Sequence, residues 1–304
     1  PISDVPANDT GYTYVVFGKA SGFSATMDLS SLDGSNGFRL DGTVESLTGW
    51  SLAHGDVNND GFDDMVVGAP NSDLEGINKG SGFVVFGKAS GFAATLDSSS
   101  LDGTSGFRVD GLTEGEFLAN GVGAGDINGD GFDDVIVGSP YTDFNGDQSG
   151  SSYVIFGKAS GFDASINLSS LDGQNGFRLD GVNAYDGSGL SVSDAGDVNG
   201  DGFGDVIVET NGVSSYVVFG KTTGFDRHMD LSSLDGSNGF RLDGESKGSS
   251  GQGSSLGTSV SSAGDINGDG FDDLITGSTY YSPAGRVNIF YGSTSGIAPQ
   301  STPG

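Results

Sequence analysis

Four acidic loops of nearly identical sequence carry the residues best suited to chemistry. Each loop follows the pattern Gly-Asp-x-Asn-x-Asp-Gly-Phe-x-Asp, and the first aspartates of the four loops are Asp56, Asp126, Asp197 and Asp265. Alternate side chains of such a tight turn point toward one centre, and carboxylate and amide oxygens are the ligands that Ca²⁺ prefers. The loops therefore predict about four calcium ions per chain.

Within each loop, the candidate ligands are the side chains at positions 1, 3, 5 and 9 and the backbone carbonyl at position 7. The glycine at position 6 allows the backbone to reverse its direction. The full set of predicted ligands is Asp56, Asn58, Asp60, Phe62 and Asp64; Asp126, Asn128, Asp130, Phe132 and Asp134; Asp197, Asn199, Asp201, Phe203 and Asp205; and Asp265, Asn267, Asp269, Phe271 and Asp273.

The loop sequence is also similar to two other structures. An EF-hand requires a bidentate Glu at position 12, but these loops have Val67, Val137, Val208 and Thr276 there. The pattern can also be turn chemistry alone, in which Asp and Asn side chains cap their own backbone. Four copies in the same register favour the metal.

The loops belong to a repeat of about 70 residues, which indicates a repeat architecture. Within one period, four segments rich in Val, Ile, Tyr and Phe are bounded by Gly, Asp and Ser, which is typical of short strands. Examples lie at 189–192, 135–137, 152–156 and 177–179. Four short strands per repeat predict an all-β fold, a β-propeller of four-stranded blades with the calcium loops between strands 1 and 2.

The number of blades follows less directly from the repeat. The chain supplies about 17 strands, which suits four or five blades, or an arc of a larger propeller. We expect a compact ring closed by pairing of the N- and C-terminal strands. The whole chain, 1–304, is expected to form a single domain, with 293–304 as a flexible C-terminal tail.

The motifs resemble a known family. The loops, followed by Val-Val-Gly-Ala-Pro at 66–70 or Val-Ile-Val-Gly-Ser-Pro at 135–140, are similar to the FG-GAP repeats of integrin α-subunit propellers and their bacterial relatives. The resemblance covers residues 12–292 and implies that calcium between strands 1 and 2 stiffens each blade. The third repeat departs from the pattern, because Gly204 replaces the acid at position 8 and Glu209-Thr210 replaces Gly-Ser-Pro, although its ligand positions are retained.

Composition excludes several classes of partner. The net charge of −29 repels phosphate groups and anionic lipid surfaces, so we expect no nucleic acid partner and no membrane insertion. No cysteine is present, which excludes disulfides and thiol catalysis. Bound cations would relieve the repulsion among 41 acidic side chains.

The loops that vary most between repeats are those from strand 2 to 3 and from strand 4 to 1. In a four-stranded meander they share the face opposite the calcium loops. We expect a protein or glycan ligand there, in contact with exposed aromatic side chains, although the same rings could merely fill gaps between blades. These residues are Trp50, Phe117, Tyr141, Phe144, Tyr185, Tyr280 and Tyr281.

Basic residues recur in register, as in Lys88 and Lys158 or Arg108 and Arg178, and predict pairing with Asp between blades. The two histidines, His54 and His228, have no recognisable catalytic partner in the sequence. The expected function is therefore a secreted or cell-surface, calcium-binding, non-catalytic module for adhesion or recognition of a cell surface or matrix. A carbohydrate-binding lectin and a polysaccharide-active enzyme domain are the alternatives.

Overall fold

The computed structural model describes residues 10–74, 77–211, 214–222, 224–244, 259–278 and 286–294. Within these residues the chain forms 20 strands in five sheets and four short 3-10 helices. The predicted all-β fold class is confirmed, and the repeats are those typical of β-propellers.

Three sheets contain the four antiparallel strands predicted for a complete blade, ordered from an inner strand to an outer one. Blade I comprises β3 (Leu52–Gly55), β4 (Asp64–Ala69), β5 (Ser81–Val85) and β7 (Gly106–Asp110). Blade II comprises β8 (Val122–Gly125), β9 (Asp134–Ser139), β10 (Ser151–Ile155) and β12 (Gly176–Asp180). Blade III comprises β13 (Ser188–Gly196), β14 (Asp205–Thr210), β15 (Ser214–Val218) and β17 (Gly239–Asp243).

Two further sheets are incomplete blades. The N-terminal half-blade contains only an equivalent of strands 3 and 4, namely β1 (Tyr12–Val16) and β2 (Gly37–Asp41). Blade IV contains strands 1 to 3, namely β18 (Ser259–Gly264), β19 (Asp273–Ser278) and β20 (Arg286–Phe290).

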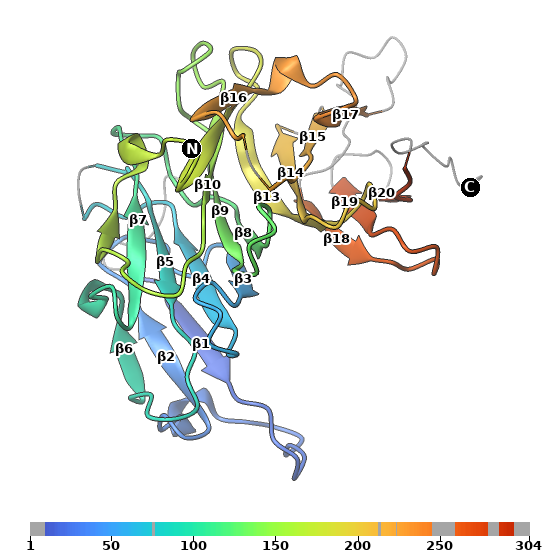
Figure 1. Cartoon of the computed structure of the whole chain (residues 1–304). Helices are drawn as coiled ribbons and strands as arrows, with labels where there is room; N and C mark the ends of the chain where they lie inside the picture. The colour runs from blue at the N-terminus through green and yellow to red at the C-terminus, as the bar shows by residue number, and fades with distance from the viewer. Residues whose placement is uncertain are drawn as a thin grey trace.

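The sheets form an arc, with β1 and β2 at one end and β18 to β20 at the other (Figure 1). In the described residues β1 pairs with β2 and β20 pairs with β19, and no ladder joins β1 to β20. The expected closure of the ring by pairing of the terminal strands is therefore not observed among the described strands, where β1 and β20 each form the third strand of a separate blade.

Three very short strands extend the blades beyond the prediction. They are β6 (Thr95–Asp97), β11 (Ser165–Ile166) and β16 (His228–Asp230), which run parallel to β2, β7 and β12 of the preceding sheet. They could not be predicted, since two or three residues carry too little alternation. A 3-10 helix follows each of these strands in the chain, and a fourth lies at the equivalent place between β1 and β2. The four helices are Leu29–Ser31, Ser98–Ser100, Leu168–Ser170 and Leu231–Ser233.

The inner strands pack so closely that they require small residues. A Cβ atom on Gly123 of β8 would lie 2.9 Å from the Cα atom of Ser193 in β13. The small residues that interleave with apolar ones in the first strand of each blade thus allow neighbouring blades to meet at the inner end of the arc.

Phenylalanine stacks join each blade to the next one. Phe162, from the connection after β10, stacks on Phe107 of β7 with ring centroids 4.6 Å apart, and Phe86 contacts both rings. The same triplet occurs at two other junctions, where Phe92 stacks on Phe38 and Phe225 stacks on Phe177. Blades I, II and III therefore each contribute an aromatic side chain to the core of the preceding sheet.

Truncation of one of these rings is expected to cost much of the stability. Because Phe162 is buried between two blades, Phe162→Ala should lower the free energy of unfolding by about 3–5 kcal/mol. Phe23 follows the same Lys-Ala-Ser-Gly sequence but is 57% exposed, so Phe23→Ala is the matched control and should change it by less than about 0.5 kcal/mol. Urea unfolding measures both, and equal effects would contradict the proposed role of the stack.

The ion pairs of the recurring arginines lie within one blade and not between blades as predicted from the sequence. Arg178 instead binds Asp180, two residues later on the same strand, at 2.5 and 2.8 Å. The ammonium group of Lys158 lies 4.8 Å from the ring centroid of Phe162 in its own connection. The prediction was wrong because residues two apart on a strand share one face, which brings the arginine and the aspartate together.

Candidate functional site

All four acidic loops lie between strands 1 and 2 of a blade, as predicted. In blade II, for example, β8 ends at Gly125 and β9 begins at Asp134. The antiparallel pairing of the two strands places the loop at one end of the blade and the connection after Ser139 at the other. The two functional surfaces expected from the sequence therefore lie at opposite ends of the strands.

In each loop, the side chains at positions 1 and 3 converge on the backbone N–H of position 5. In the first loop, the N–H of Asp60 donates to Asp56 Oδ1 and to Asn58 Oδ1, both at 3.0 Å, and the N–H of Gly61 donates to Asp56 Oδ2 at 2.9 Å. The other three loops repeat this arrangement. Each loop thus gathers carboxylate and amide oxygens around one turn, most of them at an exposed or half-buried surface.

The aspartate at position 9 lies beneath its loop and is fully buried. Asp134 Oδ2 accepts the N–H of Ile127 at 3.0 Å, and Oδ1 accepts the N–H of Gly157 at 2.9 Å. Burial raises the pKa of Asp134 to about 8, and the neighbouring charges of Asp130 and Asp126 raise it further. The same causes raise the pKa of Asp64 to about 7 and that of Asp205 to about 8.

The oxygen atoms of each loop suit a hard cation, and in this structure they accept hydrogen bonds from the backbone N–H groups of the same turn. Within the described part of the chain, no three His, Cys, Asp or Glu side chains lie close enough together to hold a metal ion. Each loop instead combines carboxylates with an amide, Asn58 in the first loop, which is an oxygen-only set of the kind that calcium uses. The position-7 carbonyls of Phe62, Phe132, Phe203 and Phe271 stay a prediction.

The apolar residue at position 2 turns each of the first three loops into a joint between blades, whereas Ile266 of the fourth loop is 51% exposed. Val57, Ile127 and Val198 are at most 1% exposed, and each packs in a core cluster with residues of the following blade. Their carbonyls accept the N–H groups of Lys158, Lys221 and Ser293 at 3.0–3.1 Å. Stabilising a loop therefore also stabilises the junction with the next blade.

Position 8 was missed as a structural position. Asp133 Oδ2 accepts the N–H of Asp56 in the preceding loop at 2.7 Å, and Asp272 Oδ2 accepts that of Asp197 at 2.8 Å. At the junction of blades II and III, where Gly204 stands, Asp194 from β13 occupies the neighbouring space, 3.2 Å from a Cβ placed on Gly204. The sequence contained one indication of this role, because an aspartate occupies position 8 in every repeat except the third.

His54 lies beside an acidic residue of the first loop. Its Nδ1 is 3.2 Å from Asp63 Oδ2, and both side chains are largely exposed. Asp63 holds position 8 of that loop, so this pair belongs to the surface formed by the acidic loops.

At the opposite end, the two kinds of variable loop meet as expected. Isolated bridges pair Gly80 with Leu118 and Gly150 with Ser188. Each bridge joins the loop between strands 2 and 3 of one blade to the chain that leads from its strand 4 into the next blade. Three of the predicted aromatic side chains, Trp50, Phe117 and Tyr141, come together and line a pocket of about 410 Å³ between blades I and II. The rings of Phe117 and Tyr141 meet edge to face at 5.4 Å.

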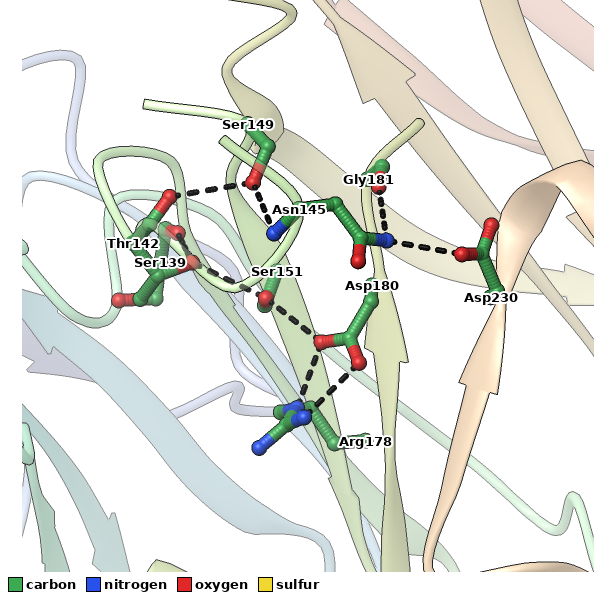
Figure 2. Close-up of polar contacts among 9 residues, drawn as sticks. All are labelled: Ser139, Thr142, Asn145, Ser149, Ser151, Arg178, Asp180, Gly181 and Asp230. Atoms are coloured by element: carbon green, nitrogen blue, oxygen red, sulfur yellow. Dashed lines mark hydrogen bonds and ion pairs between the residues drawn. The ribbon is translucent and has the colours of Figure 1, made fainter. Parts of the chain in front are cut away.

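The loop that carries Tyr141 is fastened by a polar network (Figure 2). Thr142 donates to Ser151 at 3.0 Å, Ser151 donates to Asp180 at 3.0 Å, and Asp180 accepts from Arg178. From the same loop, Asn145 Nδ2 donates to the carbonyl of Gly181 at 2.8 Å and to Asp230 Oδ2 at 2.9 Å. Asp230 is the last residue of β16, which in the chain lies between β15 and β17 of blade III. The loop that carries Tyr141 is therefore bound both to its own blade and to the connection between these two strands of blade III.

The other predicted aromatic residues do not join this pocket. Phe144 stacks on the guanidinium group of Arg178 at 3.5 Å, and the hydroxyl of Tyr185 donates to Asp147 Oδ2 at 3.2 Å. Tyr280 and Tyr281 lie outside the described residues. The structure therefore brings together three of the seven aromatic residues.

Comparison with known protein families identifies the repeats. Residues 48–86, 119–155 and 256–290 match the model of the FG-GAP repeat. The matches do not include blade III, which nevertheless has the same four strands. The chain therefore contains FG-GAP repeats, as its motifs predicted, and in this it is similar to integrin α-subunits.

The curated relatives are large proteins. The chain is 27% identical to integrin alpha-5 of Xenopus laevis over 220 residues, which are 71% of this chain and 18% of that protein. It is 35% identical to integrin alpha-8 of Gallus gallus over 32% of this chain and 9% of that protein. It is also 28% identical to phosphatidylinositol-glycan-specific phospholipase D of Bos taurus over 53% of this chain and 18% of that protein. The chain thus spans less than a fifth of each.

None of the helices in the described part of the chain has the length and the apolar character needed to cross a membrane.

Proposed function

We propose that this chain is an extracellular, calcium-stabilised recognition module that binds its ligand at the end of the arc opposite the calcium loops. Each of the four loops holds one Ca²⁺ through the side chains at positions 1, 3, 5 and 9 and the carbonyl at position 7. The observation that carries the proposal is the repeated convergence of oxygens around one backbone N–H, as with Asp56 and Asn58 around Asp60.

Calcium would act on the ligand face through the junctions. When bound, the ion supplies positive charge that offsets the repulsion among the loop carboxylates. The loops also carry Val57, Ile127 and Val198 into the next blade, so ordering them fixes the blades relative to one another. A pocket between two blades, such as that of Trp50 and Tyr141, keeps its shape only if the blades keep their positions.

A binding role is proposed over a catalytic one for two reasons. The integrin relatives are consistent with an adhesion or recognition module at the cell surface. The three carboxylates whose pKa burial raises most, Asp64, Asp134 and Asp205, belong to the calcium loops and are held by backbone N–H groups. The likeness to a phospholipase D makes enzymatic activity the alternative to be measured.

Binding of the chain to immobilised extracellular matrix is expected to require calcium. Surface plasmon resonance should show binding in calcium buffer that is lost in EGTA and is not restored by magnesium, since Mg²⁺ demands a stricter octahedral geometry. Equal binding with and without calcium would contradict the proposed function. Release of products from polysaccharide or glycosylphosphatidylinositol substrates would show that the chain is an enzyme instead.

A further inference from the structure

The pocket between blades I and II contains amide side chains with no structural task. Asn71, Asn78, Asn120 and Gln148 all line it, and none of these amide groups hydrogen-bonds to another described residue. Elsewhere, amides such as Asn145 and Asn175 are bound to backbone carbonyls. Each amide offers two donors and one acceptor, so the pocket presents a concentrated and unused hydrogen-bonding capacity.

Aromatic surfaces stand beside these amides. Trp50 is 50% exposed and Tyr141 is 39% exposed, and Phe117 packs against the edge of Tyr141. Exposed rings that do not pack in the core provide flat apolar surfaces for a ligand.

The backbone holds the lining residues in place before any ligand binds. Leu47, Asn78, Phe117 and Gln148 all have positive φ angles, between 49° and 56°, which is unusual for side chains other than glycine. Hydrogen bonds maintain this conformation: the N–H of Phe117 donates to the carbonyl of Asn78 at 3.2 Å, and that of Gln148 donates to Asp143 Oδ1 at 2.7 Å. Such strain, when it gathers around one cavity, indicates a preorganised site.

The charge of the pocket limits the kind of ligand. Its described lining contains no Asp, Glu, Lys or Arg, although the chain as a whole carries a net charge of −29. The overall field disfavours anionic ligands, and a site for a cationic group would be expected to contain a carboxylate. A neutral ligand with both apolar faces and many hydroxyl groups matches the amides and the rings together.

We infer that the pocket formed by Trp50, Phe117, Tyr141 and the four amides binds a neutral carbohydrate. A sugar ring would lie against the aromatic surface, and its hydroxyl groups would exchange hydrogen bonds with the amides. The volume of about 410 Å³ lies in the range of small-molecule sites. This inference rests on the proposed recognition function and names the class of its ligand.

The test uses the full chain in calcium buffer on an array that contains neutral, sialylated and uronic oligosaccharides. We expect binding to neutral glycans only. By calorimetry with the best neutral glycan, Trp50→Ala and Asn78→Ala should each weaken binding by at least about tenfold. Tyr185→Ala removes an exposed aromatic side chain outside the pocket and should leave the affinity unchanged.

Thermal melts of the variants in calcium establish that each one is folded. Absence of glycan binding, a preference for acidic glycans, or unchanged affinity in both pocket variants would overturn the inference. If a protein ligand bound in calcium instead and Trp50→Ala abolished its binding, the carbohydrate inference would fail while the proposed recognition function stood. Failure of calcium to stabilise the chain would count against the proposed function itself.

Discussion

Removal of calcium is expected to lower the melting temperature of this protein by about 20 °C, the largest effect that we predict. A ligand at 100 times its dissociation constant adds about 2.7 kcal/mol to the free energy of unfolding at each site. Four occupied sites would therefore add about 10 kcal/mol, and 1 kcal/mol corresponds to about 2–4 °C in a domain somewhat smaller than this one. Differential scanning calorimetry with calcium and then with excess EGTA measures the shift.

Variants in one loop separate the ion from other effects of EGTA. Asp130→Ala removes a side chain at position 5 that is exposed, so it should lower the melting temperature in calcium and have little effect in EGTA. Asp163→Ala removes an exposed carboxylate outside the loops and should have no effect in either buffer. Identical behaviour of the two variants would mean that the loop is a turn rather than a calcium site.

The second large effect is an unusual dependence of stability on pH in the metal-free protein. Burial raises the folded-state pKa values of Asp64, Asp134 and Asp205 to about 7, 8 and 8, whereas in the unfolded chain these groups ionise at their ordinary value of 3.8. Between these values the folded state binds more protons than the unfolded state, so stability falls as the pH rises. We therefore expect the metal-free melting temperature to decrease from about pH 5 to about pH 8.

Calcium should remove this dependence, because it binds the ionised carboxylates and displaces their protons. At pH 7, saturation is expected to release about two protons per chain from these three groups. Calorimetric titrations in buffers of different ionisation enthalpy measure the release. A metal-free stability that rises with pH over this range, or calcium binding without proton release, would show that the buried carboxylates are already ionised.

The repeat allowed most of the fold to be predicted from the sequence. The segment 135–137 lies within β9 and 177–179 lies within β12, because Val, Ile and Phe bounded by Gly and Asp carry a clear strand signal. The parallel strand β11 could not be predicted, since its two residues, Ser165 and Ile166, pair only with a neighbouring blade. Closure of the ring is not observed among the described strands, since a count of strands does not say which of them pair.

The candidate sites were predicted unequally. The side chains of Asp56 and Asn58 do meet at the backbone N–H of Asp60, as expected for alternate positions of a turn, and their binding of a metal stays a prediction. The inter-blade contact of Asp133 could not be foreseen, because it depends on the distance between two blades. The meeting of Trp50 with Tyr141 also depends on the packing of blades, since these residues come from different repeats.

The most direct test of the central claim is the calcium stoichiometry of the purified chain, measured by isothermal titration calorimetry after removal of bound metal. The loops predict about four calcium ions in the wild-type chain, and one fewer after substitution of both Asp126 and Asp130 by Ala. Binding of no calcium, or the same stoichiometry in both proteins, would contradict the assignment of these loops as calcium sites.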